Sequence, residues 1–486
     1  MRKLLSTALL IALPFTLTSC EELLGEWDRP TPTVVTPSSE KAIASLTLNT
    51  DDLFLITTET GLRVGTTNSD AIITYTTSNP AVATVSSDGT VTAVATGTAT
   101  IVVSVSETDH FIGTSKSYTV NVSGQLIDLG SATGDVNIAA GSTDKLTGTM
   151  THGVILADGA IVRLSGVTIT PTAAAAIKCE GDATIILEGT NNLTGPSKYP
   201  AILPGGAGKT LTIKGEGELT ANASSQAAAI GTSKMSGYNI CGDIVIEGGT
   251  ITANATGNSA AIGNGGNSGN TPVFDMSCGN IIIHGGIITA TGGTNAAAIG
   301  TGYAQQKNQS CGNIIIDGGT ITANGGDISG GAGIGTGASY KSNTCGDITI
   351  TGDAVVTAKG ANQAAGIGTG DIPDSSYGVV TCGKITISTS GDVTATGGNN
   401  AAGIGSGVNN NATATSTKNT CGSISITATG KVNATKGAEA TYDIGPGKNS
   451  FIEDAGIAGS VVVEASVTWN GTNGYIGTSS GYNRAQ

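Results

Sequence analysis

The feature that most constrains the fold is a short phrase, small-small-Ile-Gly-x-Gly, that recurs along most of the chain. Clear copies surround Ile262, Ile299, Ile334, Ile367 and Ile404, and looser copies surround Ile177, Ile202, Ile230, Ile444 and Ile476. Successive isoleucines of the phrase lie 25 to 40 residues apart. A unit this short cannot bury its apolar side chains alone and must stack on its neighbours. The period therefore predicts a solenoid of about ten units over residues 124–486.

Each central unit carries two further phrases that alternate with a period of two residues. One begins with Cys-Gly and contains alternating isoleucines, as in Cys278–Ile283, and the other follows a Gly-Gly corner, as in Gly318–Ala323. Three short strands and three glycine corners per unit predict one coil of a parallel β-helix. We expect two inner columns: Ile246, Ile283, Ile316 and Ile350 on one face, and Ile251, Ile288, Ile321 and Val355 on the next.

The composition agrees with an all-β repeat protein. Glycine accounts for 74 of the 486 residues, whereas charged residues make up 12 % and aromatic residues 3 %. Long Ala/Glu/Lys/Leu stretches are missing, which argues against coiled coils and helical bundles. The net charge of −14 argues against nucleic acid as a partner.

The first residues predict an export signal. Arg2 and Lys3 precede an apolar run that ends at Leu17, so residues 1–19 read as a secretory signal peptide. The ending Leu17-Thr18-Ser19-Cys20 resembles the bacterial lipoprotein box. The resemblance implies that Cys20 is lipidated and anchors the protein in the bacterial outer membrane, exposed at the cell surface. The alternative is ordinary secretion without a role for Cys20.

Residues 20–40 predict a tether between the lipid and the first folded unit. Pro30, Pro32 and Pro37 lie among threonines in this stretch, a composition typical of a semi-extended chain.

Residues 41–123 predict a β-sandwich, because short alternating strands are separated by turn signals at close spacing. The segment Tyr75–Val85, followed by Asp88–Ala93 and Gly97–Ile101, resembles the bacterial Ig-like group 2 family. Tyr75 stands where that family often has tryptophan, so the resemblance implies an aromatic residue in the core. It also implies a spacer or adhesion module on a cell-surface protein.

The repeat region resembles pectate-lyase-type right-handed β-helices and surface adhesins in its architecture. The predicted fold is therefore all-β, with an Ig-like β-sandwich followed by a right-handed parallel β-helix of about ten coils. This resemblance implies no residue roles.

Extra residues fall at one place in each central unit, after the Ile-Gly-x-Gly phrase. We expect these loops, Asn264–Ser277, Thr301–Ser310, Thr336–Thr344, Thr369–Thr381 and Ser406–Thr420, to project from one edge. Six aromatic residues lie in the loops of the repeat region: Tyr238, Phe274, Tyr303, Tyr340, Tyr377 and Phe451. A line of such rings beside Asn, Ser and Thr predicts a glycan-binding edge. The alternative is that each ring covers the base of its own loop.

Six cysteines share one phase of the repeat: Cys241, Cys278, Cys311, Cys345, Cys382 and Cys421. They could form a metal or redox ladder or a column of buried thiols. The chain has no Cys-x-x-Cys pair or nearby histidine, so the pattern favours buried thiols that act as small apolar residues. We predict no metal and no cofactor.

Outward threonines form a second row, comprising Thr252, Thr289, Thr322 and Thr394. A regular threonine array can order water, as in ice-binding proteins. Val356 and Asn433 are expected to interrupt this row, which favours the ordinary preference of threonine for strands.

The acidic residues of the repeat region offer no recognisable catalytic set. Asp243, Asp317 and Asp347 are expected on solvated faces, and no two carboxylates are predicted to face one glycosidic bond. We therefore predict a monomeric, cell-surface carbohydrate-binding or adhesion protein without catalytic activity, whose partners are a polysaccharide or host glycan and, through its lipid, the membrane. Two alternatives remain: a polysaccharide lyase or glycoside hydrolase built on the β-helix, and a purely structural envelope protein.

Overall fold

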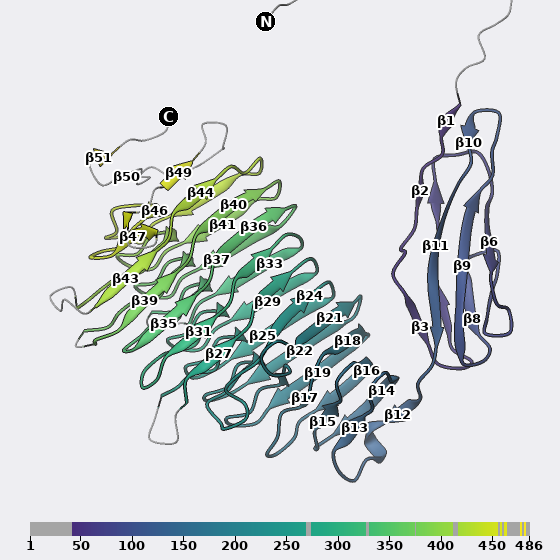
Figure 1. The fold of residues 1–486 in the computed structure, drawn as a ribbon, viewed down its shortest axis with the longest axis horizontal. Helices are drawn as coiled ribbons and strands as arrows, with labels where there is room; N and C mark the ends of the chain where they lie inside the picture. The colour runs from purple at the N-terminus through teal and green to yellow at the C-terminus, as the bar shows by residue number, and fades with distance from the viewer. Residues whose placement is uncertain are drawn as a thin grey trace, which may run out of the picture.

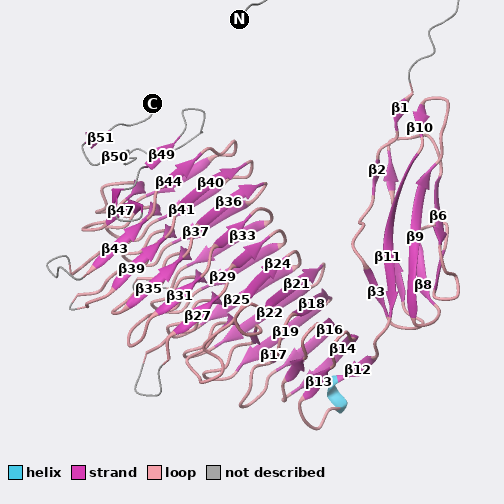
Figure 2. Cartoon of the chain, viewed as in Figure 1, coloured by secondary structure: helices cyan, strands magenta, loops and turns pink. Residues whose placement is uncertain are grey.

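The computed structural model describes residues 41–268, 274–326, 330–374, 376–411 and 417–454, together with 457–458, 461–463, 477–478 and 481–482. In these residues the regular secondary structure consists of strands, apart from one 3-10 turn at Leu129–Ser131, and loops and turns connect the strands (Figure 2). No helix of this described part is long and apolar enough to cross a membrane. The predicted signal peptide, Cys20 and the tether lie outside it.

The first domain is a β-sandwich. Its strands are β1 (Ala42–Ile43), β2 (Leu46–Thr47), β3 (Leu53–Leu55), β4 (Thr60–Leu62), β5 (Thr66–Thr67), β6 (Ile73–Thr77), β7 (Ala83–Val85), β8 (Thr90–Ala93), β9 (Gly97–Val105), β10 (Phe111–Ile112) and β11 (Thr114–Val122). The order β3-β11-β9-β6 forms the larger sheet, and β4-β8-β7 forms a second sheet. Ile101 and Val120 are fully buried in the core, and Tyr75 packs against it as expected.

The second domain is a parallel β-helix, in which each strand pairs with the equivalent strand of the next coil (Figure 1). The first coils contain β12 (Leu126–Asp128) and the long strands β14 (Thr143–Met150) and β16 (Ala160–Ile169). The row that follows the Cys-Gly corner consists of β18 (Ala183–Glu188), β21 (Thr210–Gly215), β24 (Asp243–Ile246), β28 (Ile281–Ile283), β32 (Ile314–Ile316), β36 (Ile348–Gly352), β40 (Ile385–Thr389), β44 (Ile424–Ile426) and β49 (Val461–Val463). The row that carries the Thr-Ile-Thr-Ala phrase consists of β19 (Thr190–Gly195), β22 (Glu218–Ala223), β25 (Thr250–Ala255), β29 (Ile287–Thr291), β33 (Thr320–Asn324), β37 (Val355–Lys359), β41 (Val393–Thr396) and β45 (Val432–Thr435).

Within the described residues, the row that carries the Ile-Gly phrase has eleven strands. They are β13 (Val136–Ile138), β15 (Val154–Leu156), β17 (Ile177–Cys179), β20 (Ile202–Leu203), β23 (Ile230–Gly231), β26 (Ile262–Gly263), β30 (Ile299–Gly300), β34 (Ile334–Gly335), β38 (Ile367–Gly368), β42 (Ile404–Gly405) and β46 (Ile444–Gly445). The strands β13 and β15 lack the phrase, so the sequence period misses the first two of these rungs. The copy at Ile476 lies outside the described residues.

A fourth row of strands appears in the later coils, where the sequence predicts three strands per coil. Its members are β27 (Met276–Cys278), β31 (Gln309–Cys311), β35 (Ser342–Cys345), β39 (Val379–Cys382), β43 (Lys418–Cys421) and β47 (Phe451–Asp454), to which β48 (Ile457–Ala458) adds antiparallel. The short strands β50 (Gly477–Thr478) and β51 (Gly481–Tyr482) pair with each other. The cysteine therefore ends one strand, and the isoleucines after its glycine begin another.

One of the two predicted inner columns is confirmed and the other needs a correction. Ile246 pairs in register with Ile283, and the column continues through Ile316 and Ile350, all buried. In the second column Val356, not Val355, is buried beside Ile321, while Val355 is 37 % exposed. The corner after Ile350 is one residue longer than the corner after Ile316, so the strand that follows is shifted by one position.

The same shift corrects the threonine row. Thr357, rather than Val356, pairs with Thr322 and with Thr394. Thr252, Thr289, Thr322, Thr357 and Thr394 thus form one uninterrupted column, which Asn433 ends.

The glycine of the repeated phrase is required by the stacking of coils. Gly300 has a φ of 131°, in the region that favours glycine, and an added Cβ would lie 1.9 Å from the carbonyl oxygen of Gly335. The equivalent glycines from Gly231 to Gly445 share a φ between 127° and 144°. A side chain at this position would overlap the backbone of the next coil.

Asp243, Asp317 and Asp347 are partly or fully exposed, as the sequence predicts, and they also join neighbouring coils. The Oδ1 atom of Asp243 accepts the backbone N–H of Asn280, at 2.7 Å between nitrogen and oxygen, and Asp347 accepts that of Lys384 at 2.8 Å. Asp317 pairs with Nδ1 of His284 at 2.8 Å. These groups satisfy backbone donors or a side chain at the corners, which is a structural role.

Candidate functional site

The segments after the Ile-Gly phrase are less open than the sequence predicts. Their first residues are buried in every central coil, including Thr301, Thr336 and Thr369. Further along the same segment, the Asn343 amide donates to the carbonyl oxygens of Gly302 and Gly337 at 3.0 and 3.1 Å. The start of each predicted loop therefore packs as a second layer against the coils.

The aromatic rings of the predicted glycan-binding edge do not share one exposed row. Tyr303 is 7 % exposed and meets Tyr340 edge to face, with ring centroids 6.0 Å apart. Burial raises the pKa of Tyr303. Tyr238 is half-buried and packs in the same way on Tyr199, at 5.3 Å between centroids. These contacts favour a covering role for the three rings Tyr238, Tyr303 and Tyr340.

The remaining predicted positions differ from one another. Phe274 is half-buried, whereas Tyr377 is 74 % exposed. Phe451 begins β47, but its side chain lies outside the described residues. Tyr377 is thus the ring of this set that a ligand could reach most readily.

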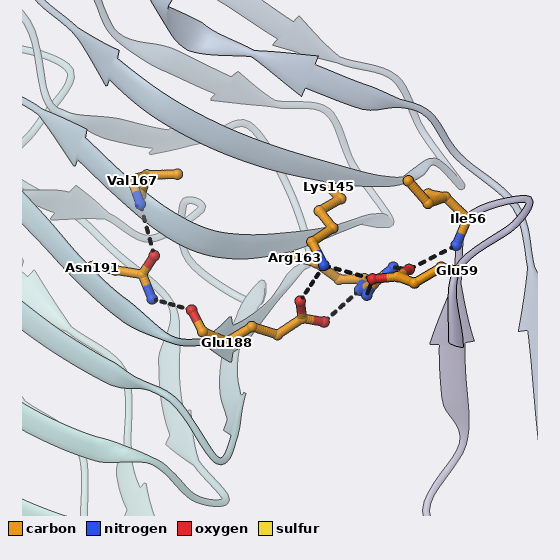
Figure 3. A network of polar contacts seen from close by, with 7 residues as sticks. All are labelled: Ile56, Glu59, Lys145, Arg163, Val167, Glu188 and Asn191. Atoms are coloured by element: carbon orange, nitrogen blue, oxygen red, sulfur yellow. Dashed lines mark hydrogen bonds and ion pairs between the residues drawn. The ribbon is translucent and has the colours of Figure 1, made fainter. Parts of the chain in front are cut away.

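The structure brings together a second set of residues at the junction of the two domains (Figure 3). Glu59 of the Ig-like domain receives two hydrogen bonds from Arg163 of β16, each 2.7 Å between nitrogen and oxygen. Arg163 also donates through Nε to Glu188 of β18 at 2.6 Å, and Lys145 of β14 bridges the same two carboxylates. The Arg163 side chain is 3 % exposed, so this pairing replaces the water that it loses.

The charges of the junction set the pKa of Glu59. Burial alone would raise it, but the hydrogen bonds from Arg163, Lys145 and the backbone N–H of Ile56 outweigh burial and lower it to about 2. Burial opposes the positive charge of Arg163, yet its contacts with Glu59 and Glu188 raise its pKa. Glu59 and Arg163 are therefore ionised in the folded protein, and the ion pair between them joins the two domains.

Asn191 fixes the corner that carries Glu188. It is fully buried, and its Oδ1 atom accepts the backbone N–H of Val167 at 3.1 Å. Its amide nitrogen donates to the carbonyl oxygens of Glu188 and Glu218, each at 3.0 Å. A single buried amide thus positions two neighbouring corners whose carboxylates face the same space.

That space is a cleft of about 590 Å³ between the Ig-like domain and the early coils. Leu53 and Phe54 of β3 line one wall, and both are half-buried. The opposite wall is formed by corners of the β-helix. The charged lining of the cleft as a whole comprises the carboxylates Asp51, Asp52, Glu188, Glu216, Glu218 and Glu247 and the cations Arg63, Arg163 and Lys214; Asp51, Asp52 and Arg63 belong to the Ig-like domain.

The sequence analysis finds no recognisable set among the acidic residues of the repeat region, whereas Glu188, Glu216, Glu218 and Glu247 of that region all line the cleft. Glu216, Glu218 and Glu247 are exposed in the cleft, as are Asp51 and Asp52. Across the described residues, no group of three or more His, Cys, Asp or Glu side chains is placed to hold a metal ion. The arrangement offers hydrogen-bond acceptors and one aromatic ring to a ligand. Sequence reasoning misses it because Glu59 and Arg163 are 104 residues apart and no motif links them.

The fold and the junction define an all-β protein in which an Ig-like domain is fixed to the first coils of a parallel β-helix. Models of known protein families match part of each of the two domains. Residues 58–115 match the bacterial Ig-like domain (group 2), and residues 281–303, 314–338, 348–371 and 385–408 match the beta helix repeat. Both kinds of domain fit surface and adhesion roles. No curated protein and no solved structure gave a match.

Proposed function

We propose that the protein is a cell-surface carbohydrate-binding or adhesion protein without catalytic activity, and that its ligand occupies the cleft between the domains. The observation that carries the proposal is the lining of this cleft, which brings Phe54 together with several exposed carboxylates. Sugars stack their C–H faces on aromatic rings and donate their hydroxyls to such acceptors. The volume of about 590 Å³ suits an oligosaccharide segment.

The charge of the cleft selects among glycans. Six carboxylates and three cations line it, and Arg163 is already occupied by Glu59 and Glu188. This excess of negative charge disfavours polymers of uronic acid and favours neutral or amino sugars.

The proposed location is the bacterial outer membrane, with lipid on Cys20 and the tether of residues 20–40 holding the domains outside. Support comes from the residues of the export signal. Metabolic labelling with a fatty acid tests the anchor. We expect labelled protein from the natural chain and none from Cys20→Ala. Equal labelling of both chains would contradict the anchor.

An array of neutral, amino and acidic oligosaccharides tests the binding function. The full chain is expected to be retained on neutral or amino glycans, and Phe54→Ala is expected to lose this retention. Tyr377→Ala is the matched control, because its ring is exposed on the predicted loop edge, away from the residues that line the cleft. Loss of retention in Tyr377→Ala, with Phe54→Ala unchanged, would place the ligand on the loop edge instead. Retention by no glycan would contradict the function.

A glycoside hydrolase is the second candidate, because several exposed carboxylates share the cleft. Hydrolysis needs two carboxyl groups that flank one bond. Release of reducing ends from a retained glycan, abolished in Glu216→Gln or Glu218→Gln, would favour the enzyme over the binding protein.

A further inference from the structure

The cysteine column of the fourth strand row has a chemistry that the binding function does not use. Cys278, Cys311, Cys345, Cys382 and Cys421 are direct partners in successive parallel strand pairs. Cys241 extends the column, because its neighbour Ile240 bridges to Ser277 in the same register. All six thiols are buried.

Two pairs of these thiols lie in direct contact. The Sγ atoms of Cys241 and Cys278 lie 3.0 Å apart, and those of Cys382 and Cys421 lie 2.8 Å apart. Adjacent strands are about 4.8 Å apart, which falls within the Cα separation of about 4.4–6.8 Å that a disulfide requires. The Cα spacing of neighbouring members of the column is therefore within the range that a disulfide spans.

We propose that the column forms three disulfide bonds between adjacent coils: Cys241–Cys278, Cys311–Cys345 and Cys382–Cys421. The two close contacts mark the first and third pairs, and they leave Cys311 and Cys345 as cross-strand partners of each other. This pairing uses every cysteine of the column. The shifted pairing, Cys278 with Cys311 and Cys345 with Cys382, would leave both ends of the column unpaired.

Cys179 has no partner in this scheme. It ends β17 in the Ile-Gly row, where its cross-strand neighbour is Leu156. Its position explains how a chain with seven cysteines after Cys20 can pair six of them.

Each bond forms by thiol–disulfide exchange with a disulfide oxidant, such as an oxidised dithiol oxidase or oxidised glutathione. One thiolate attacks the oxidant to give a mixed disulfide, and the second thiolate displaces the oxidant as a thiol. Two cysteine thiols lose two protons and two electrons, which reduce the oxidant to its two thiols. Burial raises the pKa of the Cys241 and Cys382 thiols in the folded coils, so the exchange takes place while the coils stack and not afterwards.

In the cell this pairing rests on the proposed export of the protein to an oxidising compartment, so the test is a refolding experiment that does not depend on location. The full chain carrying Cys20→Ser is reduced in denaturant, refolded with oxidised and reduced glutathione, and unfolded again in an alkylating agent. Mass spectrometry then counts the modified cysteines and maps the cross-linked peptides. We expect one cysteine outside the cross-links, Cys179, and the three cross-linked peptide pairs.

Two variants make the pairing specific. Cys241→Ser is expected to free Cys278 alone, whereas Cys179→Ser, the matched control, is expected to leave all three cross-links in place. Alkylation of all seven cysteines after refolding would overturn the proposal. Cross-links between Cys278 and Cys311, or between Cys345 and Cys382, would overturn it as well. Failure of glycan binding with the three cross-links present would contradict the proposed function and leave the disulfides standing.

Discussion

The domain junction predicts a pH dependence that one substitution should remove. Glu59 has a folded pKa of about 2 against an ordinary value of 4.5. Because the folded value is lowered, the stability it contributes is fully present above pH 4.5 and is lost as the pH falls towards 2. This lowering of the pKa corresponds to a contribution of about 3 kcal/mol to the free energy of unfolding at pH 7. About 2 kcal/mol of that contribution is lost by pH 3. Glu59→Gln abolishes this contribution at every pH.

The assay is differential scanning calorimetry of the full chain at pH 7 and pH 3, followed through the unfolding of the Ig-like domain. Glu59→Gln is expected to lower the free energy of unfolding, relative to the natural chain, by about 3 kcal/mol at pH 7 and by about 1 kcal/mol at pH 3. Glu107→Gln is the matched control, because Glu107 also pairs with a lysine but is 62 % exposed. Such an exposed pair contributes little to stability because water screens it, so Glu107→Gln should leave the free energy of unfolding nearly unchanged at both pH values. If the free energy of unfolding fell equally between pH 7 and pH 3 in the natural chain and in Glu59→Gln, the reasoning would be refuted.

Three further predictions concern the β-helix. Gly300→Ala would place a Cβ 1.9 Å from a carbonyl oxygen, so it should lower the free energy of unfolding by more than about 2 kcal/mol in denaturant titrations. Gly206→Ala is the control: a Cβ there would have nothing within 4 Å, so the free energy of unfolding should stay nearly unchanged. Val356→Asp should abolish cooperative unfolding of the later coils, whereas Val355→Asp should be tolerated; equal effects would contradict the strand register. Burial raises the pKa of Asp371 to about 7, so its stability contribution is present below 3.8 and lost as the pH rises through 7. Asp371→Asn should therefore stabilise the chain by about 2–3 kcal/mol more at pH 8 than at pH 5, and an effect independent of pH would contradict the buried charge.

The β-helix is predictable from the sequence because equivalent positions of successive coils need the same residue types. The coils from Ile230 to Gly445 each have an isoleucine inside and a glycine where the backbone of the next coil approaches, so the column of Ile246 and Ile283 and the phrase at Gly300 can be predicted directly. The burial of the cysteines follows from the same periodicity. The Ig-like domain is recognisable from a few turn and strand motifs around Tyr75.

The features that escape prediction depend on single insertions or on distant residues. One extra residue before Val355 reverses which valine is buried, and hydrophobicity cannot choose between two adjacent valines. Tyr303 lies in a predicted loop, but its burial depends on contact with Tyr340 of the next coil. The cleft needs the Ig-like domain to dock on β14 and β16 through Glu59, and no local pattern encodes that contact.

The most direct test of the account is isothermal titration calorimetry of the full chain with the oligosaccharide that the array retains best, followed by chromatography of the recovered sugar. The account predicts saturable binding to one site, weakened by about tenfold or more in Phe54→Ala, and recovery of the sugar intact. Unchanged affinity in Phe54→Ala would contradict the cleft as the binding site. Recovery of cleaved sugar would contradict a function limited to binding.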